Sequence, residues 1–305
     1  MPPAQKTGKQ SRDTQPFSDI VRLAIPNKGR IAAPVMELVE KSGLHLAESG
    51  EQRRLITRTL DPHVEILFAR PADIPGYVEN GAADLGITGH DMVTERAADV
   101  QELLDLQMGR AKLVLAVHED SAIQTPRELN GHRVATEFPV MAGTYFARKK
   151  INADIVQVGG ACEATPHLGI ADAIVDLTSS GTTLKTNRLR VIDEVLVTST
   201  YLIANRESLV KKKEKIDEIH LAFESVIRAR GQCYLMMNVK KNCLDAVKRV
   251  LPGLSGPTVM DVASSEGLVA VHAVVSEERV YMLISQLKQA GARDILVMSI
   301  QRMIR

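Results

Sequence analysis

The stretch AIVDLTSSGTTL, residues 173–184, passes from a short apolar run through an acid into hydroxyl residues around one glycine. Residues 173–175 predict a buried strand, and Asp176 stands at its exposed carboxyl end. In sheets with parallel strands, ligands bind outside these ends, and a glycine turn lets the backbone approach a phosphate. The carboxylate of Asp176 can accept hydrogen bonds from ribose hydroxyls. The stretch therefore favours a binding site for a phosphorylated sugar. An ordinary turn with Thr182 as a helix cap remains an equal alternative on this stretch alone.

The segments on either side predict an α/β fold. Apolar strands are expected at 21–25, 54–58, 63–69, 84–89, 112–118, 133–136, 154–158 and 172–176, and helices after residue 30, at 71, near 90, and over 139–149 and 163–169. Strands that alternate with helices of about ten residues are typical of βαβ units and mostly parallel sheets. We expect two small lobes, because residues 100–190 form a complete alternating set by themselves.

A long helix near 207–230 separates these lobes from a different pattern. Its lysine-rich start, residues 211–215, favours a solvated helix face over a nucleic-acid contact. Beyond residue 231, strands are predicted at 233–239, 257–262, 267–275 and 293–300, and helices at 242–250 and 277–290. The order βαββαβ predicts a C-terminal ferredoxin-like domain.

Composition excludes several classes of protein. The 305 residues allow two or three domains, and a net charge of +1 with 3% aromatic residues and no Trp argues against nucleic-acid binding. Cys162, Cys233 and Cys243 have no metal-ligand spacing and are interpreted as reduced thiols. No apolar run is long enough to span a membrane, and residues 1–19 lack the apolar core of a signal peptide. We therefore expect a disordered N-terminal lead and a cytoplasmic protein.

Six segments occur in the order typical of one known family. They are VRLAIPNKGR at 21–30, RPADIPG at 70–76, DLGITGHD at 84–91, RVATEF at 133–138, GIADAIVDLTSSGTTL at 169–184 and GARDILV at 291–297. Each segment is weak alone, but together they span nearly everything after residue 20. The chain resembles the long form of the ATP phosphoribosyltransferase family, whose members carry out the first step of histidine biosynthesis.

The resemblance implies a reaction and a domain organisation. N1 of the adenine of ATP displaces pyrophosphate from C1 of 5-phosphoribosyl 1-pyrophosphate (PRPP), which gives phosphoribosyl-ATP. Two lobes like those of periplasmic binding proteins would form the active site between them, and the second lobe would be inserted in the first. We expect lobe I at 20–105 and 190–230, lobe II at 106–189, and a histidine-binding regulatory domain at 231–305.

Departure of pyrophosphate leaves positive charge on the ribose and negative charge on the leaving group. The site must therefore stabilise polyanions and align two substrates. The resemblance assigns the ribose hydroxyls to Asp176 and the 5-phosphate to the turn after it: Thr178, Ser179, Ser180, Gly181, Thr182 and Thr183. It also implies Mg²⁺, bound largely through the pyrophosphate and water rather than through protein ligands.

Lys28 and Arg30 are candidates for the pyrophosphate and the triphosphate. Both follow the first strand at a helix start, where two cations are unfavourable unless an anion binds. Arg70, at another strand end, is a similar candidate, and the resemblance places Glu137 and Glu163 in the cleft near ATP. A first-turn carboxylate would also explain Glu163. The predicted catalytic group is Lys28, Arg30, Glu163 and Asp176.

In the third domain, the resemblance places inhibitory histidine near Asn238, Leu254, Thr258 and Ala273. Some relatives carry an acid where this chain has Asn238, so the amino group of histidine would be held differently here. A ferredoxin-like domain also commonly serves as an oligomer contact. The resemblance implies homo-oligomers, from dimers to hexamers.

Two alternative functions remain to be weighed. A non-enzymatic solute-binding module shares the two-lobed architecture, but the missing signal peptide and the hydroxyl loop after Asp176 argue against it. Nucleobase-salvage phosphoribosyltransferases have a similar loop. They usually show two adjacent acids before it, whereas this chain has only Asp176.

Overall fold

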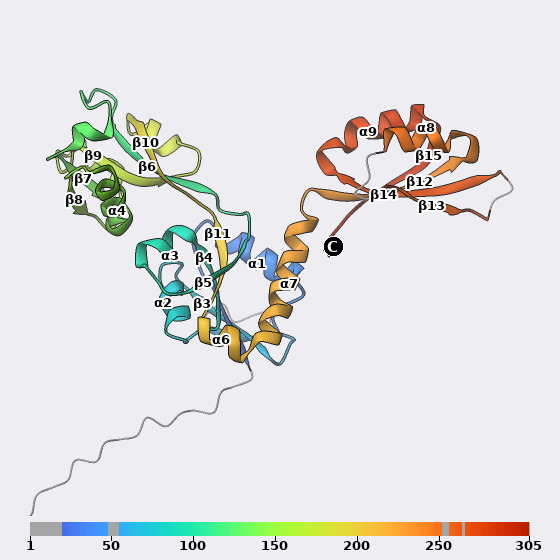
Figure 1. Ribbon diagram of the computed structural model, residues 1–305, viewed down its shortest axis with the longest axis horizontal. Coiled ribbons are helices and arrows are strands. Elements are labelled where there is room, and N and C mark those ends of the chain that lie inside the picture. Colours follow the sequence, from blue (N-terminus) through green and yellow to red (C-terminus); the bar gives the residue numbers. More distant parts are fainter. Residues whose placement is uncertain (1–19, 48–54, 252–255, 264–265, 305) are drawn as a thin grey trace, which may run out of the picture.

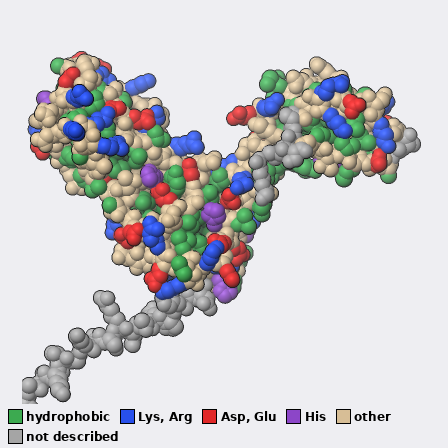
Figure 2. All heavy atoms as spheres, viewed as in Figure 1, with side chains coloured by type: hydrophobic (Ala, Val, Ile, Leu, Met, Phe, Trp, Pro, Cys, Tyr) green, Lys and Arg blue, Asp and Glu red, His purple; other side chains and the backbone are tan. Residues whose placement is uncertain are grey.

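The computed structural model describes residues 20–47, 55–251, 256–263 and 266–304. The predicted disordered lead and Leu254 lie outside the described residues. The chain forms three sheets, which belong to three separate bodies joined in sequence (Figure 1). Lobe II and the C-terminal domain extend from lobe I in different directions, as the outline in Figure 2 also shows.

Lobe I is a six-stranded sheet in the order β2-β3-β1-β4-β11-β5. Its strands are β1 (Val21–Pro26), β2 (Ile56–Arg58), β3 (Val64–Ala69), β4 (Leu85–Gly89), β5 (Gln101–Asp105) and β11 (Thr200–Ala204). β1 runs parallel to β3 and β4, whereas β11 is antiparallel to β4 and β5. The apolar sides of α1 (Ala32–Lys41) and α7 (Lys213–Ala229) pack on one face, and α2 (Ile74–Glu79) and α3 (His90–Arg96) pack on the other.

Lobe II is a five-stranded sheet in the order β10-β6-β9-β7-β8. Its strands are β6 (Ala111–His118), β7 (Arg133–Thr136), β8 (Asp154–Gln157), β9 (Ala173–Thr178) and β10 (Leu189–Thr198). The helix α4 (Pro139–Lys149) covers one face. The other face carries α5 (Thr182–Thr186) and a 3₁₀ helix, η2 (Cys162–Ala164). A second 3₁₀ helix, η1 (Pro126–Leu129), precedes β7.

Some elements differ from the sequence-based expectation. The helix expected at 163–169 is wrong: only the 3₁₀ helix η2 forms, because Pro166 and Gly169, with a φ of 68°, follow it. Residues 190–198, which the sequence placed in lobe I, continue β10 and pair with β6 in the sheet of lobe II. The long helix expected at 207–230 is divided into α6 (Arg206–Lys211) and α7, with a break at Lys212.

The C-terminal domain confirms the predicted βαββαβ order. Its elements are β12 (Gln232–Lys240), η3 (Lys241–Cys243), α8 (Leu244–Val250), β13 (Thr258–Asp261), β14 (Leu268–Ser276), α9 (Glu277–Gln289) and β15 (Ala292–Ser299). The antiparallel sheet has the order β13-β14-β12-β15. Alternate residues, such as Leu235 and Met237, are buried against α8 and α9, and the opposite face of the sheet remains open.

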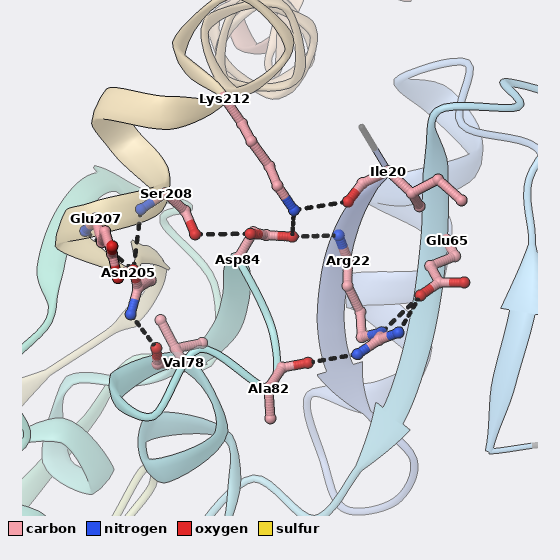
Figure 3. Close-up of polar contacts among 10 residues, drawn as sticks. All are labelled: Ile20, Arg22, Glu65, Val78, Ala82, Asp84, Asn205, Glu207, Ser208 and Lys212. Atoms are coloured by element: carbon pink, nitrogen blue, oxygen red, sulfur yellow. Dashed lines mark hydrogen bonds and ion pairs between the residues drawn. The ribbon is translucent and has the colours of Figure 1, made fainter. Parts of the chain in front are cut away.

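A buried carboxylate attaches the returning chain to lobe I. Asp84 accepts hydrogen bonds from the Ser208 hydroxyl at 2.6 Å, the Lys212 ammonium at 2.9 Å and the Arg22 amide at 2.8 Å (Figure 3). Asn205 caps α6, since its side chain accepts from the amides of Glu207 and Ser208. These contacts join β1 and β4 to the segment that leads into α7.

Candidate active site

The alternation of side chains along β9 places Asp176 on the opposite face from α4. Ala173 and Val175 enter the core beneath α4, whereas Ile174 packs on the face that carries Cys162 and α5. Because successive side chains of a strand point to opposite faces, Asp176 shares the face of Ile174. Its carboxylate accepts a hydrogen bond from the Leu177 amide at 2.7 Å.

The turn after β9 exposes hydroxyl groups around an open glycine. The Gly181 amide donates to Thr178 Oγ1 at 2.9 Å, and the hydroxyls of Ser180 and Thr182 are 2.9 Å apart. Gly181 has a φ of +75°, and a Cβ built on it would have no atom within 4 Å. The turn therefore needs glycine for its backbone conformation, and the space beside that glycine is open to a ligand.

Two more carboxylates lie near Asp176. β7 and β9 are parallel with Thr136 opposite Val175, so Glu137 and Asp176 follow at the same edge of the sheet. Burial, opposed by the Leu177 amide, and the negative charges of Glu163 and Glu137 raise the pKa of Asp176 to about 6. An acid cluster of this kind offers hydrogen-bond acceptors to a hydroxyl-rich ligand.

The same surroundings make Cys162 unreactive. Burial and the charges of Asp176, Glu137 and Glu163 raise the pKa of its thiol, which donates a hydrogen bond to the Ala135 carbonyl at 3.2 Å. A thiol in such a site stays protonated and acts as a small apolar group.

Lobe I presents its candidate cations at one edge. Lys28 and Arg30 follow β1 and Arg70 follows β3, and all three residues are exposed. Because β1 and β3 are parallel, their carboxyl ends lie together. Nη2 of Arg30 donates to the carbonyl of Gly109 at 3.0 Å, in the connection that leads into lobe II.

The strand pairings place the carboxyl ends of the strands in both lobes beside the two segments where the chain crosses from one lobe to the other. In lobe II, Thr178 pairs with Lys112 at the start of β6, just beyond Gly109. In lobe I, Gly89 at the end of β4 pairs with Thr200, where the chain returns. The hydroxyl turn and its carboxylates therefore belong to the lobe II side of the crossings, and the candidate cations belong to the lobe I side.

Sequence reasoning missed Gly109. A Cβ at this position would lie 2.6 Å from Ile31 Cγ2 and 2.9 Å from Thr200 Oγ1, and its φ is +61°. Only glycine lets the connection pass this closely between the turn after β1 and the start of β11. An isolated glycine between two strands was the available signal.

The residues predicted to bind inhibitory histidine do not all lie together in the structure. Asn238 and Thr258 lie on the open face of the C-terminal sheet, and Asn238 Nδ2 donates to Asp294 Oδ2 at 2.9 Å. Ala273 pairs with Leu235 and is 5% exposed in the core beneath the helices. Its side chain therefore points away from that of Asn238.

Within the described ranges, no group of three or more His, Cys, Asp or Glu side chains is arranged to hold a metal ion. No helix in the described part of the chain combines the length and apolarity needed to cross a membrane.

Two α/β lobes, with a hydroxyl-rich glycine turn on one and exposed cations at strand ends of the other, favour an enzyme that acts on phosphorylated substrates. The family model described as ATP phosphoribosyltransferase matches residues 70–225, and the one described as HisG, C-terminal domain, matches residues 229–302. The chain belongs to the ATP phosphoribosyltransferase family, in the long form that carries this C-terminal domain.

Individual relatives agree with this assignment. The ATP phosphoribosyltransferase of Methanocella arvoryzae is 56% identical over 94% of this chain and 100% of its own length. That of Methanosarcina mazei is 53% identical over 93% of this chain and 100% of its own length. The solved ATP phosphoribosyl transferase (HisG:HisZ) complex from Thermotoga maritima matches with a TM-score of 0.61 and 29% identity, covering 68% of this chain and 98% of that one. The predicted transferase of the first step of histidine biosynthesis, with its C-terminal regulatory domain, is confirmed.

Proposed function

We propose that the turn at 178–183 binds the 5-phosphate of PRPP and that Asp176 accepts hydrogen bonds from its ribose hydroxyls. One observation carries this assignment. Gly181 has an open, left-handed backbone beside the exposed residues Ser180 and Thr182, and it comes five residues after a half-buried carboxylate. Hydroxyls and backbone amides donate to phosphate oxygens, and the carboxylate can only accept when ionised.

The candidate cations of lobe I complete the proposed site. Lys28 and Arg30 bind the departing pyrophosphate and the triphosphate of ATP, and Arg70 binds ATP beside them. Glu137 and Glu163 contact ATP from lobe II. Catalysis by Lys28, Arg30, Glu163 and Asp176 consists of alignment and charge stabilisation, because adenine N1 already carries a nucleophilic lone pair.

Mg²⁺ suits this site as an ion that arrives with its substrate. The described residues include no protein cage for it, and Mg²⁺ commonly binds through phosphates and water. When bound, it neutralises charge on the pyrophosphate. The carboxylates of Asp176, Glu137 and Glu163 remain available to accept hydrogen bonds from ribose hydroxyls and from water.

The C-terminal domain binds histidine as feedback inhibitor through Asn238 and Thr258 on the open sheet face. The predicted neighbour Ala273 contributes only backbone there, because its side chain is in the core. Leu254, which lies outside the described residues, completes the proposed set.

The same face forms the contact of a homo-oligomer, a dimer to a hexamer. It exposes Met260, Leu296 and Met298 by 45–52%. It also holds His272, whose Nδ1 lies 2.6 Å from the Tyr234 hydroxyl and whose buried Nε2 has no hydrogen-bond partner in the described structure. We assign the protein to the cytoplasm, where its thiols stay reduced; its three cysteines are unpaired.

The direct test mixes purified protein with ATP, PRPP and Mg²⁺ and follows the absorbance of phosphoribosyl-ATP, with and without histidine. Adenine in place of ATP gives no product if the triphosphate is recognised. Histidine lowers the rate, and Asn238→Ala raises the concentration needed for half inhibition. An adduct with adenine but not with ATP contradicts the assignment.

The turn is tested with matched glycine variants. Gly181→Val abolishes turnover while the protein stays folded, since the space beside Gly181 is open. Gly131→Val is the control. Gly131 has a φ of +80° and equally open surroundings, but it precedes β7 and so lies at the amino end of that strand, away from the proposed phosphate site. Each variant loses stability of about 1–3 kcal/mol from backbone strain. Normal activity of Gly181→Val rejects the phosphate site.

A further inference from the structure

One side chain of lobe I caps a helix of lobe II. Glu95 lies near the end of α3, and its Oε1 accepts from the Val140 amide at 2.9 Å. Its Oε2 accepts from the Met141 amide at 3.0 Å. Both amides belong to the first turn of α4, which has 11 residues and no side-chain cap hydrogen bond from its own N-cap residue, Phe138. A carboxylate from the other lobe therefore satisfies this helix end.

The rest of α3 is fixed to lobe I and to the crossing. Thr198, the last residue of β10, donates through Oγ1 to Asp91 Oδ1 at 2.8 Å and accepts from the Asp91 amide at 3.1 Å. Val93 packs into the core beneath α2, whereas Met92 packs against the core of lobe II. The helix α3 thus contacts both lobes, and Glu95 stands at its far end.

The helix that Glu95 holds begins directly beside the active site. Glu137 lies two residues before α4 and shares its sheet edge with Asp176. The angle between the lobes decides how far these carboxylates lie from Lys28 and Arg30. We propose that Glu95 is a positioning residue for the transfer reaction, which holds the lobes at the angle that lets PRPP and ATP bridge them. This inference rests on the proposed assignment of the substrates to the two lobes.

The contacts of Glu95 indicate which kinetic constant should change when this side chain is removed. Hydrogen bonds to a carboxylate are stronger than neutral ones, a negative charge is favoured at a helix N-terminus, and two bonds fix an orientation. Without Glu95, the lobes adopt a wider range of angles, and only a fraction of them binds substrate productively. The apparent affinity for each substrate then falls by that fraction. Once both substrates are bound they bridge the lobes themselves, so kcat changes little.

The test compares Glu95→Gln and Glu95→Ala with Glu79→Ala. Glu79 is a matched control, because its carboxylate also accepts a backbone hydrogen bond, from the Asp99 amide at 2.9 Å, but within lobe I. We expect KM for PRPP and for ATP to rise roughly tenfold in Glu95→Ala and by less in Glu95→Gln, which keeps one acceptor. Both variants keep kcat within about twofold of wild type, and Glu79→Ala keeps wild-type KM values.

Small-angle scattering supplies a second readout. The radius of gyration of Glu95→Ala exceeds that of wild type without substrates and returns to the wild-type value with PRPP and Mg²⁺. Unchanged KM values in Glu95→Ala overturn the proposal, and so does a loss of kcat at unchanged KM or an equal rise of KM in Glu79→Ala. If Glu95→Ala fails to fold, the same criteria apply to Glu95→Gln. Failure of the proposed substrate assignment is distinct, because Gly181→Val then keeps normal activity whatever the KM values of the Glu95 variants.

Discussion

Nη1 of Arg230 donates a hydrogen bond to the carbonyl oxygen of Leu106, 2.7 Å away. Arg230 stands between α7 and β12, at the joint with the C-terminal domain, and Leu106 follows β5, where the chain leaves for lobe II. Three residues beyond Leu106, the Gly109 carbonyl accepts the hydrogen bond from Arg30. The joint of the regulatory domain is thus connected by two hydrogen bonds and a short backbone segment to a candidate phosphate-binding residue.

The joint also borders a cavity. A cavity of about 590 Å³ lies between α1, the end of α7 and the C-terminal domain, and its lining includes Met108, Arg230, Gln232 and Ser299. A change in the orientation of the C-terminal domain would alter this cavity and the position of Arg230. Coupling between sites requires an element that both sites bias, and these two hydrogen bonds make the segment from Leu106 to Gly109 the candidate for that element.

Arg230→Ala is therefore expected to uncouple inhibition from catalysis. The variant keeps activity within about twofold of wild type and still binds histidine, but it requires roughly five- to tenfold more histidine for half inhibition. Arg228→Ala is the control, since Arg228 pairs with Glu224 at 2.7 Å on the same helix. Inhibition curves and calorimetric measurement of histidine binding together test whether Arg230 couples binding to inhibition. Wild-type inhibition in Arg230→Ala excludes the coupling.

The raised pKa of Asp176 predicts opposite effects on activity and stability. Its pKa in the folded protein is about 6 against an ordinary value of 3.8, so the folded state binds the proton more tightly. Stability therefore falls as pH rises from about 4 to 6, and the full cost of the buried charge is present above that range. At pH 8, Asp176→Asn gains stability on the order of 1–2 kcal/mol, and this gain shrinks toward pH 4.

We expect Asp176→Asn to lose activity, because an amide cannot replace the carboxylate that we propose accepts hydrogen bonds from two ribose hydroxyls. In the wild type, kcat/KM for PRPP falls as pH drops through about 6, since this parameter reports groups of the free enzyme. Urea titrations at pH 8 and pH 5 and a pH profile of kcat/KM provide the measurements. A variant that is destabilised at pH 8 refutes the burial argument.

The candidate site could be proposed from the sequence because strand ends carry local signals. Glu137 follows β7 directly, Asp176 follows the apolar residues 173–175 within β9, and parallel pairing of the two strands makes them neighbours. The elements that were wrong had weak signals. β10 is a largely half-exposed edge strand with Asp193 and Glu194 and two register shifts, so its alternation is irregular. Pro166 and Gly169, which follow η2, are the local signals against a longer helix there.

Contacts between distant segments could not be predicted in this way. Glu95 lies among charged residues and suggests an exposed helix end, yet its partners are backbone amides 45 and 46 residues later. The face of the sheet on which Ala273 lies could not be predicted either. A shift of one residue along a strand moves a side chain to the other face of the sheet. Register and inter-lobe geometry are set by the tertiary structure.

Asp84→Ala tests the network that attaches α6 and α7 to lobe I. The substitution removes the acceptor of the Ser208 hydroxyl and of the Arg22 amide. It also removes the charged partner of Lys212, whose side chain is only 17% exposed and keeps only the Ile20 carbonyl as an acceptor among the described residues. Removing one partner from a largely buried charged pair costs about 3–5 kcal/mol, which urea unfolding measures as a lower midpoint.

The matched control for Asp84→Ala is Asp99→Ala. Asp99 pairs with Arg206 at 2.7 Å, but the two side chains are 75% and 58% exposed, so the loss stays below about 1 kcal/mol. Asp84→Asn falls between the two, since its amide oxygen still accepts from one donor while the charge that balances Lys212 is gone. Equal losses in Asp84→Ala and Asp99→Ala would show that water replaces the carboxylate, and that the network does not hold the returning chain in place.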